Sequence, residues 1–200
     1  TINLTVLTLD LALKKVFSPV ASAHEMHMLA ESPAFFLTKS SEGLTFAQHL
    51  ENRLREKAAQ ESVIIFGMGS QIVFADAPQA LHVRIIASLQ VRVERMIQKR
   101  GLEPKDAERF LELSDRKHKR YISTIYGQDW SDPSLYNVIL NTDNLGIEEA
   151  AGFIQYMAEN RQTPAPLEAS LVPGGEVQPV IFKHPSEEEF ARILDMHQME

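Results

Sequence analysis

Residues 61–77 read ESVIIFGMGSQIVFADA, and this stretch decides the fold. Its apolar run, Val63 to Phe66, leads directly into the turn Gly67-Met68-Gly69. A continuous apolar run is typical of a strand buried on both faces, and glycine gives the chain the freedom to turn sharply after it. The stretch therefore predicts an α/β protein in which a glycine turn leaves the carboxyl end of a buried strand.

Predicted helices alternate with similar apolar runs on both sides of this strand. Thr45 and Gln48 form a capping box that starts the helix before it. Gly101 and Gly127 stand where helices commonly end. Further strands are predicted at 81–87 and 136–140, and further helices at 88–100, 104–126 and 147–160. The alternation predicts a parallel sheet flanked by helices, and we expect residues 1–160 to form this domain.

The two ends of the chain differ from this centre. Residues 1–43 match the pattern poorly, because prolines and a glycine separate their strand-like and helix-like fragments. Residues 161–180 are rich in proline and glycine, which predicts a linker. Residues 181–200 are expected to carry an appended amphipathic helix at 185–199. Its apolar face would dock on the chain itself, which we favour, or on a protein partner.

The overall composition excludes several classes of site and partner. The chain has 200 residues, 44% of them hydrophobic, and a formal net charge of −7, which disfavours binding to nucleic acid or to an anionic membrane. It has no cysteine, so disulfides, thiolate zinc sites and cysteine nucleophiles are excluded. No apolar run is long enough to span a membrane, and the first residues lack the features of a signal peptide. We expect a cytoplasmic protein.

A possible metal site lies near the start of the chain. His24 and His27 are three residues apart beside Glu25, and two histidines at this spacing can share a metal ion. No third ligand follows with a recognisable spacing, so we favour a polar helix surface and predict no metal site.

Two basic clusters stand out in this acidic protein. The helix at 88–100 directly follows a strand, so its first turns lie at the carboxyl edge of the sheet, where open α/β folds bind ligands. One interpretation of both clusters is an exposed helix face paired with nearby acids. The other is a surface that binds phosphate through planar arginine groups. The candidate phosphate-binding residues are Arg92 and Arg95 in the first cluster and Arg116, Lys117, Lys119 and Arg120 in the second.

The glycine turn lacks the features of an ATP-binding loop. A loop of the GxxxxGK[ST] type needs a lysine for the terminal phosphates and a Ser or Thr for magnesium. Ser70, Gln71 and Ile72 follow Gly69, and the motif occurs nowhere in the chain. The turn is therefore either a tight turn after a buried strand or a turn that faces a different phosphate group.

Four stretches resemble the cytidylate kinase-like branch of the nucleoside monophosphate kinases. They lie within residues 46–160, a little over half of the chain. In chain order the stretches are VIIFGMGSQIVF, LHVRIIASLQVRVERM, SDRKHKRYISTIYGQDWSDPSLYNVILNT and LGIEEAAGFI. The third of these is the most specific, because it combines the spacing of Asp115 and Tyr121 with the YG-x-DW-x-DP run and the final Asn-Thr.

The resemblance implies a P-loop kinase fold that moves a phosphoryl group from ATP to a nucleoside monophosphate with Mg²⁺. It places Gly67 and Gly69 beside the acceptor monophosphate and Arg92 on the helix that approaches the phosphates. It makes residues 115–126 a lid whose basic side chains close over the transferred group. We expect the basic residues between 92 and 120 to converge at one edge of the fold.

The chain also departs from the family pattern. Met68 stands where the family usually has an arginine, and His118 stands where the lid usually has one. One hypothesis is therefore a degenerate kinase-like protein that binds a nucleotide or phosphate, needs no cofactor and has a regulatory role. Another is an active nucleoside monophosphate kinase that uses ATP and Mg²⁺ and whose P-loop lies outside this chain. A third is a protein–protein interaction domain.

Overall fold

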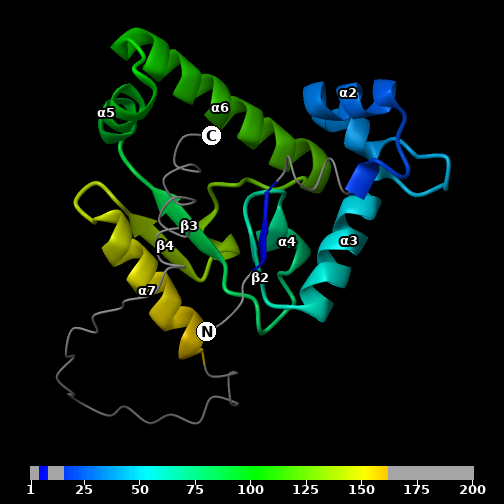
Figure 1. The fold of residues 1–200 in the computed structure, drawn as a ribbon. Coiled ribbons are helices and arrows are strands. Elements are labelled where there is room, and N and C mark those ends of the chain that lie inside the picture. The colour runs from blue at the N-terminus through cyan, green and yellow to red at the C-terminus, as the bar shows by residue number, and fades with distance from the viewer. Residues whose placement is uncertain (1–4, 9–15, 162–200) are drawn as a thin grey trace. The chain divides into compact units, whose positions relative to one another are not determined.

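The computed structural model describes residues 5–8 and 16–161 (Figure 1). These residues form helices and short parallel strands, which confirms the predicted α/β class. The elements are β1 (Thr5–Leu7), α2 (Ala23–Glu31), η2 (Pro33–Leu37), α3 (Phe46–Gln60), β2 (Val63–Ile65), α4 (Ser70–Val73), β3 (Val83–Ile86), α5 (Leu89–Arg100), α6 (Pro104–Tyr126), η3 (Pro133–Leu135), β4 (Val138–Asn141) and α7 (Ile147–Glu159). The predicted linker at 161–180 falls, apart from its first residue, outside the described residues, as does the appended helix at 185–199.

The described residues fall into two compact units. Unit 1 comprises the residues up to Ala75 together with Leu113–Leu135. Unit 2 comprises Asp76–Glu112 and the residues from Tyr136 onward. Helix α6 contributes its first part to unit 2 and its second part to unit 1. The sequence predicts one domain over residues 1–160, and this stays a prediction, because two compact units can belong to one domain.

Unit 1 contains the strand that precedes the glycine turn. In it β1 pairs with β2 in parallel, with Thr5 opposite Val63. Helix α3 starts as predicted, because the Thr45 hydroxyl accepts a hydrogen bond from the Gln48 N–H and the Gln48 side chain accepts one from the Thr45 N–H, at 3.2 and 2.9 Å. The turn after β2 leads into the short helix α4.

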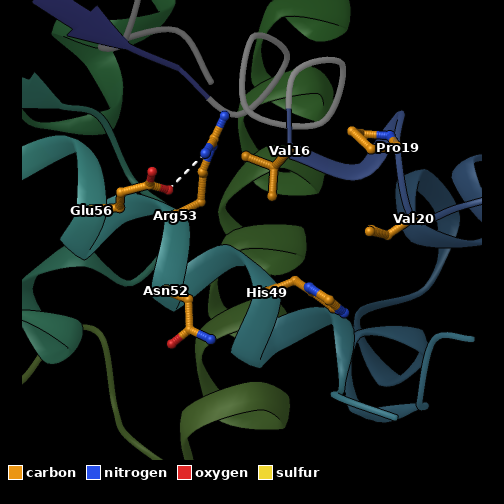
Figure 2. A pocket seen from close by; sticks show the side chains of 7 residues that line it. All are labelled: Val16, Pro19, Val20, His49, Asn52, Arg53 and Glu56. Atoms are coloured by element: carbon orange, nitrogen blue, oxygen red, sulfur yellow. Dashed lines mark hydrogen bonds and ion pairs between the residues drawn. The ribbon is translucent and has the colours of Figure 1, made fainter. Parts of the chain in front are cut away.

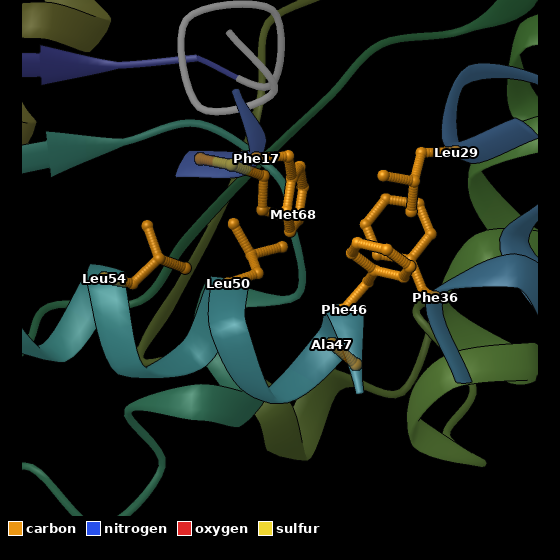
Figure 3. Close-up of a cluster of buried hydrophobic side chains, with 8 residues drawn as sticks. All are labelled: Phe17, Leu29, Phe36, Phe46, Ala47, Leu50, Leu54 and Met68. Carbon is orange, nitrogen blue, oxygen red and sulfur yellow. The ribbon is translucent and has the colours of Figure 1, made fainter. Parts of the chain in front are cut away.

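An apolar cluster forms the core of unit 1 (Figure 3). In the figure Leu50 and Leu54 point from α3 toward Phe17 and Met68. Phe17 meets Phe36 and Phe46 edge to face, with ring centroids 5.8 and 5.7 Å apart. Burying one such ring contributes roughly 1.5–3 kcal/mol, so this cluster is the main source of stability in the unit. Its buried members are Phe17, Leu29, Phe36, Phe46, Ala47, Leu50, Leu54 and Met68.

Unit 2 contains the second parallel pair, β3 and β4, which run from Val83 opposite Val138 to Ile86 opposite Asn141. Helix α5 begins at the predicted cap, where the Ser88 hydroxyl accepts from the Val91 N–H, and ends at Gly101 in the left-handed conformation. The buried apolar cluster of unit 2 is small and consists of Met96, Ala107 and Leu111. Within residues 5–8 and 16–161, no helix is both long enough and apolar enough to cross a bilayer.

Candidate functional site

The glycine turn after β2 has an unusual backbone. Gly67, Met68 and Gly69 all have a positive φ, at 68°, 59° and 71°. This region suits glycine but costs a residue with a Cβ roughly 1–2 kcal/mol. Met68 therefore needs contacts from elsewhere in unit 1 to keep its conformation.

Two contacts hold Met68 in place. Its side chain is 3% exposed and belongs to the apolar cluster of unit 1. Its carbonyl oxygen accepts a hydrogen bond of 2.9 Å from the hydroxyl of Tyr126, in the last turn of α6. The side chain at the position of the family's arginine is therefore packed into the core and presents no charge to a ligand.

Gly69 lies against the same tyrosine. A Cβ added to Gly69 would stand 2.1 Å from the Tyr126 ring, which no side chain can tolerate without a shift of the ring. Glycine is thus required here by its φ and also by the close approach of Tyr126. Sequence reasoning did not select Tyr126, and the only local signal was its place before Gly127 in the YG-x-DW run.

His118 lies at the other end of the turn. A Cβ on Gly67 would be 3.8 Å from the Cε1 atom of His118. The imidazole also packs on the indole of Trp130, with ring centroids 4.8 Å apart and the planes tilted by 58°. The histidine at the position of the lid arginine therefore sits between the glycine turn and an aromatic side chain.

Helix α6 carries two largely buried tyrosine side chains in this part of unit 1, Tyr121 and Tyr126. Burial raises the pKa of Tyr121 well above its ordinary value, and the neighbouring Tyr126 phenol and Glu51 carboxylate raise it further. Burial also raises the pKa of Tyr126, and the Glu51 carboxylate raises it further. The Tyr121 hydroxyl is buried beside the Tyr126 phenol and makes no hydrogen bond to the turn, whereas Tyr126 donates to Met68.

The predicted lid is part of an unbroken helix. Residues 115–126 form the second half of α6, and Ile122 on one face of it is fully buried. The predicted basic side chains Arg116, Lys117, Lys119 and Arg120 are all exposed. The helix thus presents its apolar and aromatic side chains to the core of unit 1 and its basic side chains to solvent.

The predicted arginines of α5 lie in unit 2. Arg95 donates to the hydroxyl of Thr142 at 3.0 Å and to the carbonyl oxygen of the same residue at 2.6 Å. The Ser88 N–H donates to Asp143 at 2.6 Å, so the start of α5 is tied to the loop after β4. Arg92 is half-buried on the same helix. Arg92 and Arg95 therefore stand at the carboxyl edge of the β3–β4 pair, where α/β folds bind ligands.

The candidate residues are divided between the two units. Gly67 and Gly69 share unit 1 with Arg116, Lys117, Lys119 and Arg120, whereas Arg92 and Arg95 belong to unit 2. Their convergence at one edge stays a prediction. In the described part of the chain, no three side chains of His, Asp or Glu form a group that could hold a metal ion.

A separate pocket of about 280 Å³ opens along α3 in unit 1 (Figure 2). Within it Arg53 pairs with Glu56 at 2.6 Å, and His49 is held by the buried Ser40 hydroxyl, 2.8 Å from its Nε2. The pocket is lined by Val16, Pro19, Val20, His49, Asn52, Arg53 and Glu56. None of these residues was selected from the sequence.

Comparison with known proteins places the chain in a family. The sequence profile of the cytidylate kinase-like family matches residues 8–144. The chain belongs to this family. The curated cytidylate kinases of Methanopyrus kandleri and Pyrococcus horikoshii are 27% and 31% identical to it over 116 and 100 residues, which are 53% and 48% of this chain.

The chain spans about half the length of these relatives, 59% of the first and 48% of the second. A uronate isomerase of Corynebacterium glutamicum is 25% identical over 121 residues, 60% of this chain and 23% of that protein. A crystal structure of an uncharacterized protein from Eubacterium ventriosum superposes with a TM-score of 0.63 at 20% identity, over 80% of this chain and 86% of that one. This likeness shows a shared fold.

Proposed function

We propose that this member of the cytidylate kinase-like family binds a nucleotide or phosphate without efficient phosphoryl transfer and acts as a regulatory module. The burial of Met68 carries this proposal. Phosphoryl transfer depends on positioned positive groups, and the loss of one such donor commonly raises the barrier by about 2.7–4 kcal/mol. At this turn the side chain is an apolar thioether inside the core.

His118 supports the same conclusion. It takes the place of a lid arginine, and an imidazole lacks the planar fork of five N–H donors with which a guanidinium group binds phosphate. Its ring packs on Trp130 instead of extending to solvent. This lid position beside the turn therefore offers fewer donors to a phosphate than the family pattern provides.

The arginine side chains that would bind phosphate are, in contrast, present. Arg92 and Arg95 stand at the carboxyl edge of β3–β4, and the Thr142 oxygens fix the orientation of Arg95. Arginine suits phosphate because its planar group offers paired N–H donors. We propose Arg92 and Arg95 as the phosphate-binding residues of unit 2, and Arg116, Lys117, Lys119 and Arg120 as those of unit 1.

Calorimetric titration with ATP and with CMP tests this function. We expect binding by the wild-type chain and an affinity about 10-fold or more lower in Arg92→Ala, because a hydrogen bond to a charged group is worth about 1.5–3 kcal/mol. Arg53→Ala is the matched control, since Arg53 is an exposed arginine paired with Glu56 on α3. Absence of binding at millimolar nucleotide would leave only an interaction domain, and equal loss in both variants would remove the role of Arg92.

The alternative is an active ATP-dependent nucleoside monophosphate kinase whose P-loop lies outside this chain. It is favoured by relatives named cytidylate kinases, of whose length this chain spans about half. A coupled assay for ADP with ATP, Mg²⁺ and a panel of nucleoside monophosphates, run on the chain together with the sequence that would supply the P-loop, decides between the two. ADP formation that falls in Arg92→Ala and in Arg120→Ala supports the kinase, whereas activity unchanged in both variants shows that the assigned roles are wrong.

A further inference from the structure

The turn at residues 67–69 does not hold its shape by its own hydrogen bonds alone. The Ser70 N–H donates to the Gly67 carbonyl at 3.1 Å, and the Ile72 and Val73 N–H groups donate to the Gly69 carbonyl at 2.8 and 3.0 Å. These bonds start α4 but leave Met68 at a φ of 59°, where a side chain is unfavourable. A group from outside the turn is needed to stabilise this residue.

Tyr126 supplies that group through two separate contacts. Its hydroxyl donates to the Met68 carbonyl oxygen at 2.9 Å. Its ring occupies the space that a Cβ at Gly69 would need. The hydroxyl fixes the direction of the carbonyl, and the ring excludes other backbone positions at Gly69.

Tyr126 is itself held by the end of α6. Tyr121 and Ile125, on the same face of the helix, pack against the apolar cluster that contains Met68, and Ile122 is fully buried. The helix stops directly after Tyr126, where the Gly127 N–H donates to Ser123 and Gly127 adopts a φ of 65°. The tyrosine therefore moves with the last turn of α6.

We propose that Tyr126 is a positioning residue that holds the 67–69 turn in its left-handed form and couples this turn to helix α6. The proposal rests on the function proposed above, in which the basic side chains of α6 bind phosphate. Arg116, Lys117, Lys119 and Arg120 are carried by the same half of the helix. A phosphate bound by these side chains that shifted the end of α6 would move the Tyr126 hydroxyl away from Met68 and release the turn.

The competing explanation is that Tyr126 only fills space. Tyr126→Phe separates the two, because it keeps the ring over Gly69 and removes only the donor to Met68. Tyr121→Phe is the matched control, since it removes a buried hydroxyl beside Tyr126, five positions earlier in the helix, that makes no hydrogen bond to the turn.

Amide hydrogen exchange and carbonyl chemical shifts of the 200-residue chain, without ligand, test the proposal. In Tyr126→Phe we expect the Ser70, Ile72 and Val73 amides to exchange about 2- to 10-fold faster, the range that one hydrogen bond accounts for. We also expect the carbonyl ¹³C resonance of Met68 to move, because this resonance responds to the loss of the hydrogen bond that the oxygen accepts while the ring stays in place. Tyr121→Phe should leave these amides and this resonance unchanged.

Three outcomes would overturn the positioning role. The first is that the turn amides of Tyr126→Phe exchange at the wild-type rate. The second is that the β3 and β4 amides of this variant exchange faster by the same factor as the turn amides. The third is that Tyr121→Phe shows the same changes as Tyr126→Phe. The coupling is tested with ATP as the probe, which should speed exchange at the turn in the wild type but add nothing in Tyr126→Phe. If calorimetry shows no nucleotide binding, the proposed function fails, while exchange in the free protein still decides the role of Tyr126.

Discussion

The two units stabilise their candidate residues in different ways. In unit 1 the glycine turn is held by an apolar cluster of eight buried residues and by one tyrosine hydroxyl. In unit 2 the start of α5 is held by polar contacts, from Arg95 to Thr142 and from Ser88 to Asp143, beside a buried cluster of three residues. Unit 1 depends on packing, and unit 2 on hydrogen bonds to charged groups.

The difference between the two units corresponds to the places where the chain departs from the family pattern. Met68 and His118, the two positions where the resemblance predicts arginines, both lie at the turn of unit 1. Unit 2 keeps its arginines at the carboxyl edge of the parallel pair. In unit 1, packing thus occupies the two positions where the family pattern predicts charge, and this is the basis of the proposed binding without transfer.

The largest expected effect concerns the core of unit 1. Phe46→Ala removes a fully buried ring and should lower the free energy of unfolding by about 3–5 kcal/mol. Phe153→Ala on α7 is the matched control, because that ring is 45% exposed and its loss should change the stability by less than about 0.5 kcal/mol. Urea denaturation measures both. Similar losses in the two variants would contradict the packing described for unit 1.

The second prediction restores the family's residue at the turn. Met68→Arg loses the buried thioether and brings a charge to the apolar cluster, so we expect a loss of about 2–5 kcal/mol and no gain of ADP formation. Met68→Leu keeps the volume and should cost less than about 1.5 kcal/mol. The measurements are thermal unfolding and the coupled assay. An arginine variant as stable as the wild type would show that Met68 is not part of the core.

The third prediction concerns the polar contacts of unit 2. Arg95→Ala removes the donors to Thr142, a buried residue, and should cost about 1.5–3 kcal/mol. Arg53→Ala removes only an exposed ion pair and should cost less than about 1 kcal/mol. Denaturant titration compares the two arginines. Equal effects would mean that the Thr142 contacts do not stabilise unit 2.

The smallest effect is a pH dependence in unit 1. The Ser22 backbone N–H and then its hydroxyl donate to Glu25 and lower the pKa of this carboxyl in the folded protein. A lowered pKa stabilises the fold above the unfolded value and loses this contribution as the pH falls through the folded value. Glu25→Gln should therefore flatten the decline in melting temperature between about pH 5 and 3.

The capping box of α3 provides the control for this experiment. Its acceptor is the neutral Gln48, so Gln48→Ala should lower the melting temperature by a similar amount at every pH. A decline with pH that is unchanged in Glu25→Gln would assign the titration to other carboxyl groups.

Much of the fold could be predicted from local patterns. The capping box at Thr45, the cap at Ser88 and the end of α5 at Gly101 lie where the sequence places them, because each depends on residues within one helical turn. The parallel pairing also follows from strands alternating with helices. Such features need no knowledge of distant contacts.

The candidate site was less predictable. The sequence shows that Met68 lacks a charge, but its burial depends on contacts with other segments, among them Phe17, 51 residues earlier in the chain. Tyr126 could not be selected because its partner, Met68, is 58 residues away. Arg95 could be predicted as a polar residue near the sheet edge, but not its bonds to Thr142, 47 residues later.

Phosphorus NMR of one sample holding the chain, ATP, CMP and Mg²⁺ tests the central claim, binding without transfer, most directly. We predict nucleotide resonances that shift or broaden in proportion to the protein added, more weakly with Arg92→Ala, and no growth of ADP and CDP signals. Equal growth of ADP and CDP at a rate that falls in Arg92→Ala would contradict the claim. Nucleotide resonances unaffected by the protein would contradict it as well.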